Sequence, residues 1–293
     1  MRLTDVIGVA SGLGASNPGC QDGPEVLRSL GFFRDLDWPP GACAWRDIVR
    51  PPAEPGLTAL ERVARVAEAV HERVAESLRA GHFPLVIGGD HSLAIGTWSG
   101  VQTALGHEGR LGLVWIDAHM DSHTFETTPS RAIHGMPLAC LLGQGEPRLT
   151  NIGGEGAKLL PEDVCLIGVR SFESGEADLL KRLGVRVYFM DEVRRRGLSE
   201  VFHEAWQRVM RHAAHGGISL DLDALDPEEE PGVGTPVAGG LCRAELIAAL
   251  RSLRDDRRLR CLEIVEYNPH ADRCFATARA VHDLCASVSG GAP

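Results

Sequence analysis

The sequence predicts an α/β fold in which helices cover both faces of a parallel sheet. The main observation is that strand-like apolar runs alternate with helix-patterned stretches along all 293 residues. Such alternation is typical of parallel sheets, because a parallel neighbour is reached through a crossover helix. A second observation is that no linker, low-complexity segment or internal repeat interrupts the pattern. We therefore expect one domain that spans residues 1–293.

The strands are predicted from short apolar runs that are rich in β-branched side chains. These runs occupy residues 4–10, 84–89, 111–117, 164–169, 185–191, 218–223 and 259–268. The first run is followed by a Gly-rich turn, so the N-terminal segment is interpreted as a strand and not as a signal peptide.

The helices are predicted from apolar residues at helical spacing. The longest such stretch covers residues 57–81 and ends at Gly81, a residue typical of helix ends. Residues 199–215 and 242–256 follow the same period.

Composition narrows the classes of function. The formal net charge of −10 argues against a nucleic-acid partner and favours a cationic or neutral small ligand. No apolar stretch is long enough to span a membrane. The eight cysteines form no CxxC pair, and several lie in apolar runs, so we expect free thiols and a cytoplasmic protein.

Four predicted strands end in acidic residues or histidine. Asp90 and His91 follow one, the stretch DAHMD (residues 117–121) follows another, and Asp221 and Glu266 mark two more. In parallel α/β sheets, ligands bind outside the carboxyl ends of the strands. Residues two apart on a strand share a face, so DAHMD would aim two carboxylates and an imidazole at one patch. Burying such a cluster is unfavourable unless it is paired or binds a cation.

Simpler interpretations exist for two of these motifs. In GGDHS, Asp90 or Ser92 would serve as the N-cap of the next helix, with His91 merely hydrogen-bonded nearby. In SLDLDALDP, residues 219–227, the aspartates would form an Asp-rich turn. We accept the turn interpretation for Asp226 alone.

The combined set predicts a metal centre. Carboxylates and imidazoles suit Mn²⁺, and no thiolate belongs to the motifs. A catalytic zinc usually keeps three protein ligands, whereas this set suits two divalent ions that share carboxylates. The candidate ligands are His91, Asp117, His119, Asp121, Asp221 and Asp223.

The motifs GGDHS, DAHMD, SLDLDALDP and EIVEYNP, in this order, resemble the manganese ureohydrolase (arginase/agmatinase) family, and most closely its arginase branch. The resemblance implies a three-layer α/β sandwich with a mostly parallel central sheet, two Mn²⁺ per chain, and a homo-oligomer, commonly a trimer or hexamer. It also implies how the ligands divide. One ion would be held by His91, Asp117, Asp121 and Asp221, and the other by His119 and Asp223 with Asp117 and Asp221 as bridges.

The resemblance assigns further roles. His134 of AIHGM would be a proton shuttle, which suits the near-neutral pKa of an imidazole. Glu266 would grip a substrate guanidinium, and Asp121 is counted as catalytic as well as a ligand. Thr235 falls near that glutamate in the family pattern. The alternatives are a core histidine for His134 and a plain turn residue for Thr235.

The far end of the substrate distinguishes one ureohydrolase from another. Thr128 and Ser130 match hydroxyls that bind an α-carboxylate in arginases, and Glu173 replaces an aspartate that meets the α-amino group. His123 is also a candidate substrate-binding residue, although it and Ala132 stand where arginases typically carry asparagines. The resemblance therefore implies that a small cationic guanidino compound, L-arginine, is hydrolysed to L-ornithine and urea.

Other classes of function remain open from the sequence. The chain would alternatively be an agmatinase, a guanidinobutyrase or a related guanidino-compound hydrolase. Two less favoured alternatives are a mononuclear zinc deacetylase-like amidohydrolase and a non-catalytic homologue. Metal counting and urea release distinguish these classes.

Overall fold

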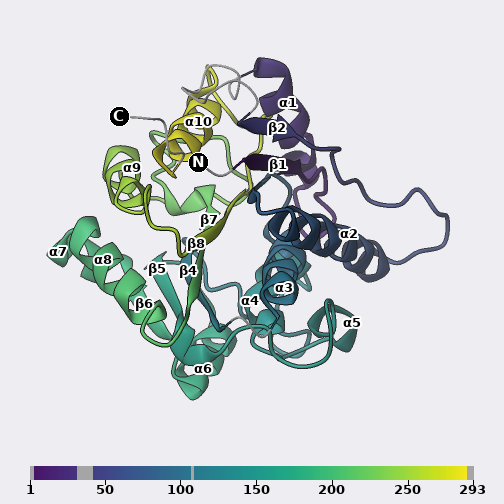
Figure 1. The fold of residues 1–293 in the computed structure, drawn as a ribbon, viewed down its shortest axis with the longest axis horizontal. Helices are drawn as coiled ribbons and strands as arrows, with labels where there is room; N and C mark the ends of the chain where they lie inside the picture. The colour runs from purple at the N-terminus through teal and green to yellow at the C-terminus, as the bar shows by residue number, and fades with distance from the viewer. Residues whose placement is uncertain (1–2, 32–41, 107–108, 289–293) are drawn as a thin grey trace.

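The computed structural model describes residues 3–31, 42–106 and 109–288 and contains an eight-stranded sheet (Figure 1). All of its paired neighbours run parallel, in the order β2-β1-β3-β8-β7-β4-β5-β6. The predicted parallel α/β fold is therefore confirmed. The strands are β1 Thr4–Gly8, β2 Cys43–Trp45, β3 Phe83–Ile87, β4 Leu111–Ile116, β5 Val164–Val169, β6 Arg186–Phe189, β7 His215–Asp221 and β8 Leu259–Val265.

Helices cover both faces of the sheet and complete three layers (Figure 1). One face packs against α2 Ala59–Arg79, α3 Ala94–Leu105, α4 Pro137–Leu141 and α6 Ser174–Leu183. The other face packs against α1 Gly23–Leu30, α7 Met190–Arg196, α8 Leu198–Val209, α9 Arg243–Arg251 and α10 Ala276–Val288. The short α5, Pro147–Thr150, lies beside α2.

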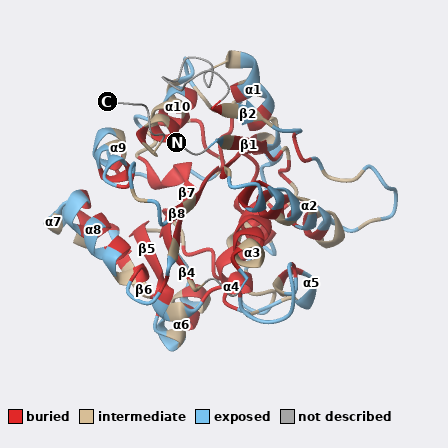
Figure 2. Ribbon diagram, in the orientation of Figure 1, coloured by how far each residue is buried: buried red, intermediate tan, exposed pale blue. Residues whose placement is uncertain are grey.

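The central strands are buried on both faces, which is why they appear in the sequence as continuous apolar runs. In β4, Val114 and Ile116 join the core under α8, α9 and α10, whereas Leu113 and Trp115 join the core under α2 and α3. Figure 2 shows the contrast between the buried sheet and the exposed outer sides of α2 and α8. The side chains at the carboxyl ends of the central strands, such as Asp117 and Asp221, are buried as well.

The predicted helix at residues 57–81 is confirmed as α2, and its ends have clear local causes. Thr58 and Glu61 form a capping box, in which each side chain accepts a hydrogen bond from the other residue's backbone N–H. Gly81 follows the helix with a φ of 77°. An N-cap of this kind contributes about 0.5–2 kcal/mol to helix stability.

Two predicted helices are wrong at their ends, and one strand was missed. The helix predicted for residues 199–215 ends at Val209, and His215 already begins β7. Gly217 of β7 lies against Trp98, where an added Cβ would come within 2.1 Å of the ring. Only a glycine fits so close to a ring, and Gly216 and Gly217 have no apolar side chain that a sequence pattern would show. The predicted strand therefore began too late. The helix predicted to end at 256 ends at Arg251, and β2 is too short to show a period.

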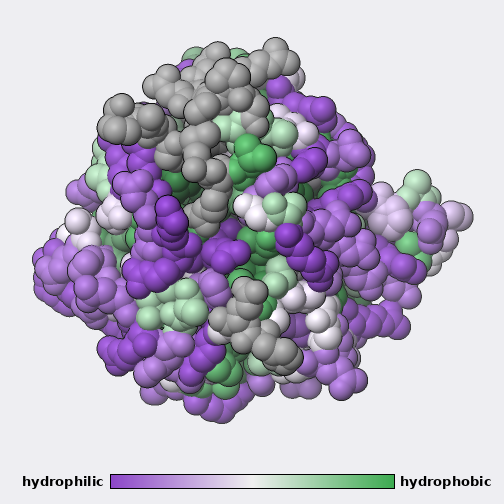
Figure 3. All heavy atoms as spheres, in the orientation of Figure 1, coloured by the Kyte–Doolittle hydropathy of each residue, from purple (hydrophilic) through white to green (hydrophobic). Residues whose placement is uncertain are grey.

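The face of the molecule shown in Figure 3 is mostly polar. On the face shown in Figure 3, hydrophilic residues predominate and apolar residues are scattered among them. No helix in the described part of the chain is long and apolar enough to cross a membrane. All eight cysteines are free thiols, as expected from the sequence, and five of them are buried.

Candidate metal centre and active site

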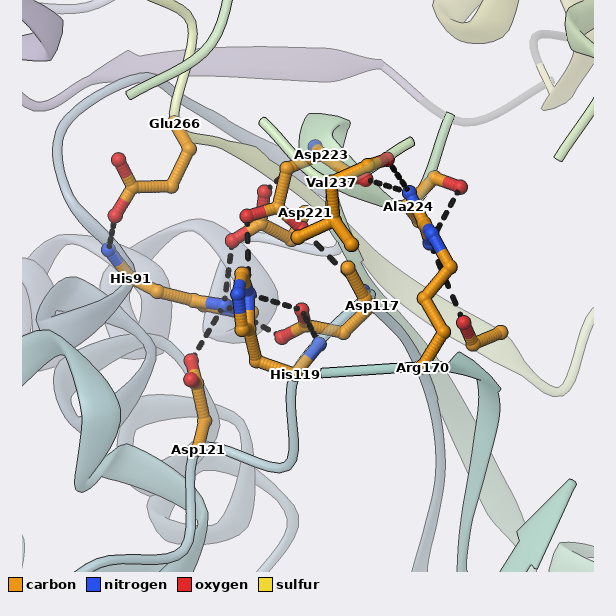
Figure 4. Close-up of polar contacts among 12 residues, drawn as sticks. His91, Asp117, His119, Asp121, Arg170, Asp221, Asp223, Ala224, Val237 and Glu266 are labelled. Carbon is orange, nitrogen blue, oxygen red and sulfur yellow. Dashed lines mark hydrogen bonds and ion pairs between the residues drawn. The ribbon is translucent and has the colours of Figure 1, made fainter. Parts of the chain in front are cut away.

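The candidate ligands come from the carboxyl ends of adjacent central strands. β3, β8, β7 and β4 are consecutive neighbours in the sheet. His91 follows β3, Glu266 follows β8, Asp221 ends β7 and Asp117 follows β4. Because the strands are parallel, their carboxyl ends meet at one edge, and the side chains converge there (Figure 4).

One group of donors surrounds His91. Its Nδ1 lies 2.9 Å from an oxygen of Asp121, 3.2 Å from one of Asp221 and 3.3 Å from one of Asp117. All four residues are buried. In the described part of the chain Nδ1 has no hydrogen-bond partner, so three carboxylate oxygens surround it without hydrogen-bonding geometry. Buried carboxylates and an imidazole arranged in this way fit a cation.

The opposite nitrogen of His91 is held from behind. Its Nε2 lies 2.9 Å from the hydroxyl of Ser219, which donates a 2.7 Å hydrogen bond to Glu263. The indole N–H of Trp98 donates to the same carboxylate oxygen. These partners hold the ring so that Nδ1 faces the three aspartates, which is how outer partners orient metal-binding histidines.

A second group shares Asp117 with the first. It consists of Asp117, His119 and Asp223. The Nδ1 atom of His119 lies 3.1 Å from an oxygen of Asp223 and 3.5 Å from one of Asp117. Asp117 is therefore the residue that the two groups share, and Asp221 belongs to the first group alone. That either aspartate bridges two ions stays a prediction.

Sequence reasoning missed the residues that support this centre. Trp115 donates to Asp117 over 2.9 Å and stacks on His91 with ring centroids 4.2 Å apart. The sequence did indicate Trp115, because it lies two residues before Asp117 and residues two apart share one face of a strand. Glu263 had a signal as well, because a carboxylate inside the apolar run of β8 needs an internal partner.

Burial and mutual repulsion shift the pKa values of the clustered side chains in directions that favour a bound cation. Burial raises the pKa of Asp221 well above its usual value, and Asp223 and Asp117 raise it further. Burial and the neighbouring Asp117 raise the pKa of Asp121 to about 6. Burial lowers the pKa of His91, but contacts with Asp117 and the other aspartates outweigh this and raise it well above its usual value. The cluster therefore holds protons in places that a metal ion would take.

We expect Mn²⁺ affinity of the metal-free protein to fall as the pH is lowered from about 8 to about 6. The reason is that Asp121 gains a proton near its pKa of about 6 and the raised pKa of His91 keeps its ring protonated, so a binding cation must displace protons. Titration calorimetry in buffers of different ionisation enthalpy measures both affinity and proton release. Equal affinity at both pH values without proton release would contradict this assignment.

Three turns at the strand ends have unusual backbone conformations. Gly88 and Gly89 have φ values of 88° and 76°, which glycine adopts without a steric penalty in a tight turn. Asp121 and Glu266 also lie in the left-handed region, at 46° and 65°, where residues with a Cβ are strained. Strain of this kind is characteristic of sites whose surroundings dictate where a side chain points.

His134 and Glu266 form a pair beside the donor groups. His134 lies in a 3-10 turn, Ile133–Gly135, and its Nδ1 is 3.0 Å from Oε1 of Glu266. The same oxygen accepts a hydrogen bond from the backbone N–H of His91, whereas the buried Oε2 has no partner among the described residues. Burial lowers the pKa of His134, but the hydrogen bond to Glu266 outweighs it and raises the pKa to about 10. We therefore expect the ring of His134 to be protonated at neutral pH.

The loop that carries Thr128 and Ser130 presents two hydroxyls at the surface. Thr128 accepts a hydrogen bond from the backbone N–H of Arg131, and Ser130 accepts one from that of Ala132. The two hydroxyl oxygens are 3.4 Å apart. Each oxygen accepts from an N–H, and one hydroxyl donates to the other over this distance, so one hydroxyl proton remains for a further acceptor such as a carboxylate.

His123 is engaged with protein groups at both ring nitrogens. Its Nδ1 lies 3.0 Å from the hydroxyl of Thr127, and its Nε2 lies 3.0 Å from Glu173 and 3.4 Å from Glu176. His123 is buried, whereas the side chain of Glu173 is 59% exposed. Sequence reasoning missed Glu176, whose pKa burial raises to about 8.

The remaining candidates have simpler surroundings. Thr235 is exposed, but the adjacent Gly234 lies against Glu266, since an added Cβ would be 3.2 Å from its Oε2. Asp226 accepts hydrogen bonds from the backbone of Glu228 and Gly240, which is the turn role predicted for it. Asp90 accepts a hydrogen bond from the N–H of Ser92, so the capping interpretation holds for Asp90 while His91 faces the cluster.

The fold and the donor set together define a class: a parallel α/β metal-binding protein with its site at the carboxyl edge of the sheet. Comparison with known proteins narrows this class. A family model described as the arginase family matches residues 4–290. The arginase of Bacillus caldovelox is 40% identical over 301 residues, which cover 99% of both chains.

Solved structures agree. The native structure of the Bacillus caldovelox arginase has a TM-score of 0.92 at 39% identity and covers 99% of each chain. The arginase of Entamoeba histolytica, solved in complex with L-ornithine, has a TM-score of 0.89 at 31% identity and covers 98% of this chain and 99% of its own. The present chain belongs to the arginase family.

Proposed function

We propose that this protein is an arginase-type ureohydrolase that converts L-arginine and water into L-ornithine and urea. The observation that carries the proposal is the buried Oε2 of Glu266, which has no partner among the described residues and lies beside the donor groups. A carboxylate so placed suits the fork of N–H donors on a guanidinium. Membership of the arginase family, with curated arginases at 32–40% identity over nearly the whole chain, supports the same reaction.

The residues around His91 and His119 fit two divalent ions, and we propose Mn²⁺. Carboxylate and imidazole ligands suit that ion, and no thiolate lies in either donor group. Four carboxylates balance the charge of two dications. When bound, such a pair supplies Lewis acidity that brings the pKa of water down toward neutrality. A single zinc ion bound by the first group would leave His119 and Asp223 of the second group without an ion to bind.

Glu266 and His134 are proposed to bind the guanidinium and to supply the proton that the leaving amine requires. Glu266 holds the guanidinium so that its carbon faces the centre. Hydrolysis adds water to this carbon and breaks the bond to the side-chain nitrogen, which must leave as an amine with an added proton. His134 is placed to donate that proton, since its pKa of about 10 keeps the ring protonated at neutral pH.

At the far end of the substrate, the hydroxyls of Thr128 and Ser130 are proposed to donate to the α-carboxylate. Glu173 is proposed to meet the α-ammonium. His123 was expected from the sequence to contact the substrate directly, but both of its nitrogens are engaged. We therefore assign it the orientation of Glu173, and we keep Thr235 as a neighbour of the guanidinium end.

Three further proposals concern organisation. The chain is proposed to act as one ureohydrolase unit over residues 1–293, because the ligands come from strands spread between β3 and β8. A homo-oligomer, trimer or hexamer, and a cytoplasmic location follow from the family resemblance and the free cysteines. Mass photometry of the purified protein tests the oligomeric state, and fractionation of the native cell tests the location.

The substrate test compares L-arginine, agmatine and 4-guanidinobutyrate by urea release. We expect kcat/KM for L-arginine to exceed that for agmatine by roughly tenfold or more. Agmatine lacks the carboxylate, so it would not form the charge-assisted hydrogen bonds that the α-carboxylate is proposed to form with this loop. A higher value for agmatine or guanidinobutyrate would keep the metal chemistry and replace the substrate.

Absence of urea release from every guanidino compound, with two metal ions bound, would instead indicate a non-catalytic homologue. One zinc per chain at full activity on an acetylated amine would indicate the deacetylase alternative.

A further inference from the structure

Arg170 directly follows β5, the next strand beyond the four that carry the ligands and Glu266. Its guanidinium donates hydrogen bonds to backbone carbonyls and lies beside the donor groups (Figure 4). The shortest run from Nη2 to the carbonyls of Asp223 and Val237, at 2.7 Å each. Longer ones, of 3.2 to 3.3 Å, reach Gly168, Ala224, Leu225 and Ala238.

The carbonyls belong to segments that matter for the site. Residues 223–225 form the turn that presents Asp223. Residues 237–238 belong to the loop whose Gly234 lies against Glu266. One side chain thus joins the turn of the second donor group to the loop beside the guanidinium-binding carboxylate.

The backbone of Arg170 adds a third connection. Its N–H donates a 2.8 Å hydrogen bond to the carbonyl of Ala118, and that of Ser171 donates to the same oxygen over 3.0 Å. Ala118 lies between the candidate ligands Asp117 and His119. Residue 170 therefore holds both chain segments that build the second donor group.

In the described part of the chain, the guanidinium of Arg170 forms no ion pair, and its hydrogen-bond acceptors are all backbone carbonyls. Its charge attracts the nearby carboxylates of Asp223 and Asp117 but repels a bound dication, so the charge has opposing effects on metal binding. The planar fork of five N–H donors offers something that the charge does not, namely fixed directions toward several carbonyls.

We infer that Arg170 is a positioning residue that sets the geometry of the second donor group, Asp117, His119 and Asp223. The inference rests on the proposed two-ion site and adds a residue that binds neither metal nor substrate. An electrostatic role and a positioning role predict different results for Arg170→Lys. The lysine keeps the charge, so an electrostatic role would leave metal binding near the parent value, whereas loss of the planar fork would weaken it.

The test measures Mn²⁺ binding to metal-free protein by calorimetry, with the bound ions counted by elemental analysis. The second donor group has three side chains and the first has four, so we take the second group as the site of the weaker ion. For Arg170→Met we expect the affinity of this weaker ion to fall by roughly 10–100-fold, the range found when outer partners of metal ligands are removed. The tighter ion should change by less than about threefold. Arg170→Lys keeps the charge but not the fork, so its weaker ion should also lose affinity.

Lys158→Met is the matched control. Lys158 is a buried cation that also donates only to loop carbonyls, those of Thr150, Gly154 and Gly156, at 2.6 to 2.9 Å. This loop contributes to neither donor group, so both Mn²⁺ affinities should match those of the parent. Thermal unfolding of the metal-free variants separates misfolding from loss of positioning, and Arg170→Lys carries the test if the methionine variant does not fold.

The outcomes separate the inference from the function on which it rests. A parent that binds only one ion overturns the two-ion site itself. A parent that binds two, with Arg170→Met binding both as tightly or more tightly, overturns the positioning role and leaves the proposed function standing. Equal weakening of both ions in a folded Arg170→Met also overturns it.

Discussion

Replacing Asp117 with asparagine is expected to remove nearly all activity, lowering turnover by at least about 10³-fold. Asp117 is the residue that both donor groups share, with one oxygen near His91 and the other near His119. An amide carries no charge and is a poor ligand for a hard divalent ion. The parent should bind about two Mn²⁺ per chain and Asp117→Asn clearly fewer, as measured by elemental analysis after reconstitution.

Asp226→Asn is the matched control for this prediction. Asp226 is also an aspartate after β7, but its oxygens accept backbone hydrogen bonds in a turn and belong to neither donor group. An asparagine keeps an acceptor for that turn, so metal content and turnover should stay near the parent values. Full metal content and activity in Asp117→Asn would remove this residue from the centre.

Replacing His134 with alanine is expected to lower turnover by roughly 10²–10⁴-fold while metal content is unchanged. The ring lies 3.0 Å from Glu266 and belongs to neither donor group, so its loss removes a proton donor without removing a ligand. Added imidazole should restore part of the rate. The measurements are steady-state kinetics and elemental analysis on the same preparation.

His134→Asn separates proton donation from support of Glu266. Asparagine keeps a hydrogen-bond donor for the Glu266 carboxylate but has no titratable proton. We expect kcat to stay low and KM to remain closer to that of the parent than in the alanine variant. Loss of Mn²⁺ from either variant would place His134 in the metal shell or the structural core, and near-parent turnover would end its catalytic assignment.

The parallel sheet was predictable because buried strands leave a strong apolar signal. VCLIGV matches β5 at both ends, and the helical period of residues 57–81 matches α2 within two residues. The prediction was wrong where tertiary packing replaced the local signal. Gly216 and Gly217 continue β7 under aromatic rings, which no local periodicity indicates.

The sequence by itself determined which chemical groups lie at the strand ends. The two-residue spacing in DAHMD and SLDLD reflects the alternation of a strand, so local chemistry is enough to choose the candidate ligands. Their convergence is observed in the structure, because β3, β8, β7 and β4 are neighbours. That order cannot be read from the chain, since β8 pairs with β3 across more than half of the sequence.

Only the tertiary structure decided how each candidate is supported. It alone shows Ser219 and Glu263 behind His91, the occupied nitrogens of His123, and the carbonyls around Arg170. The physical reason is that a ligand's identity is local, whereas its direction depends on hydrogen bonds from segments far away in the sequence. A buried polar group must find such partners, and the fold decides which ones it meets.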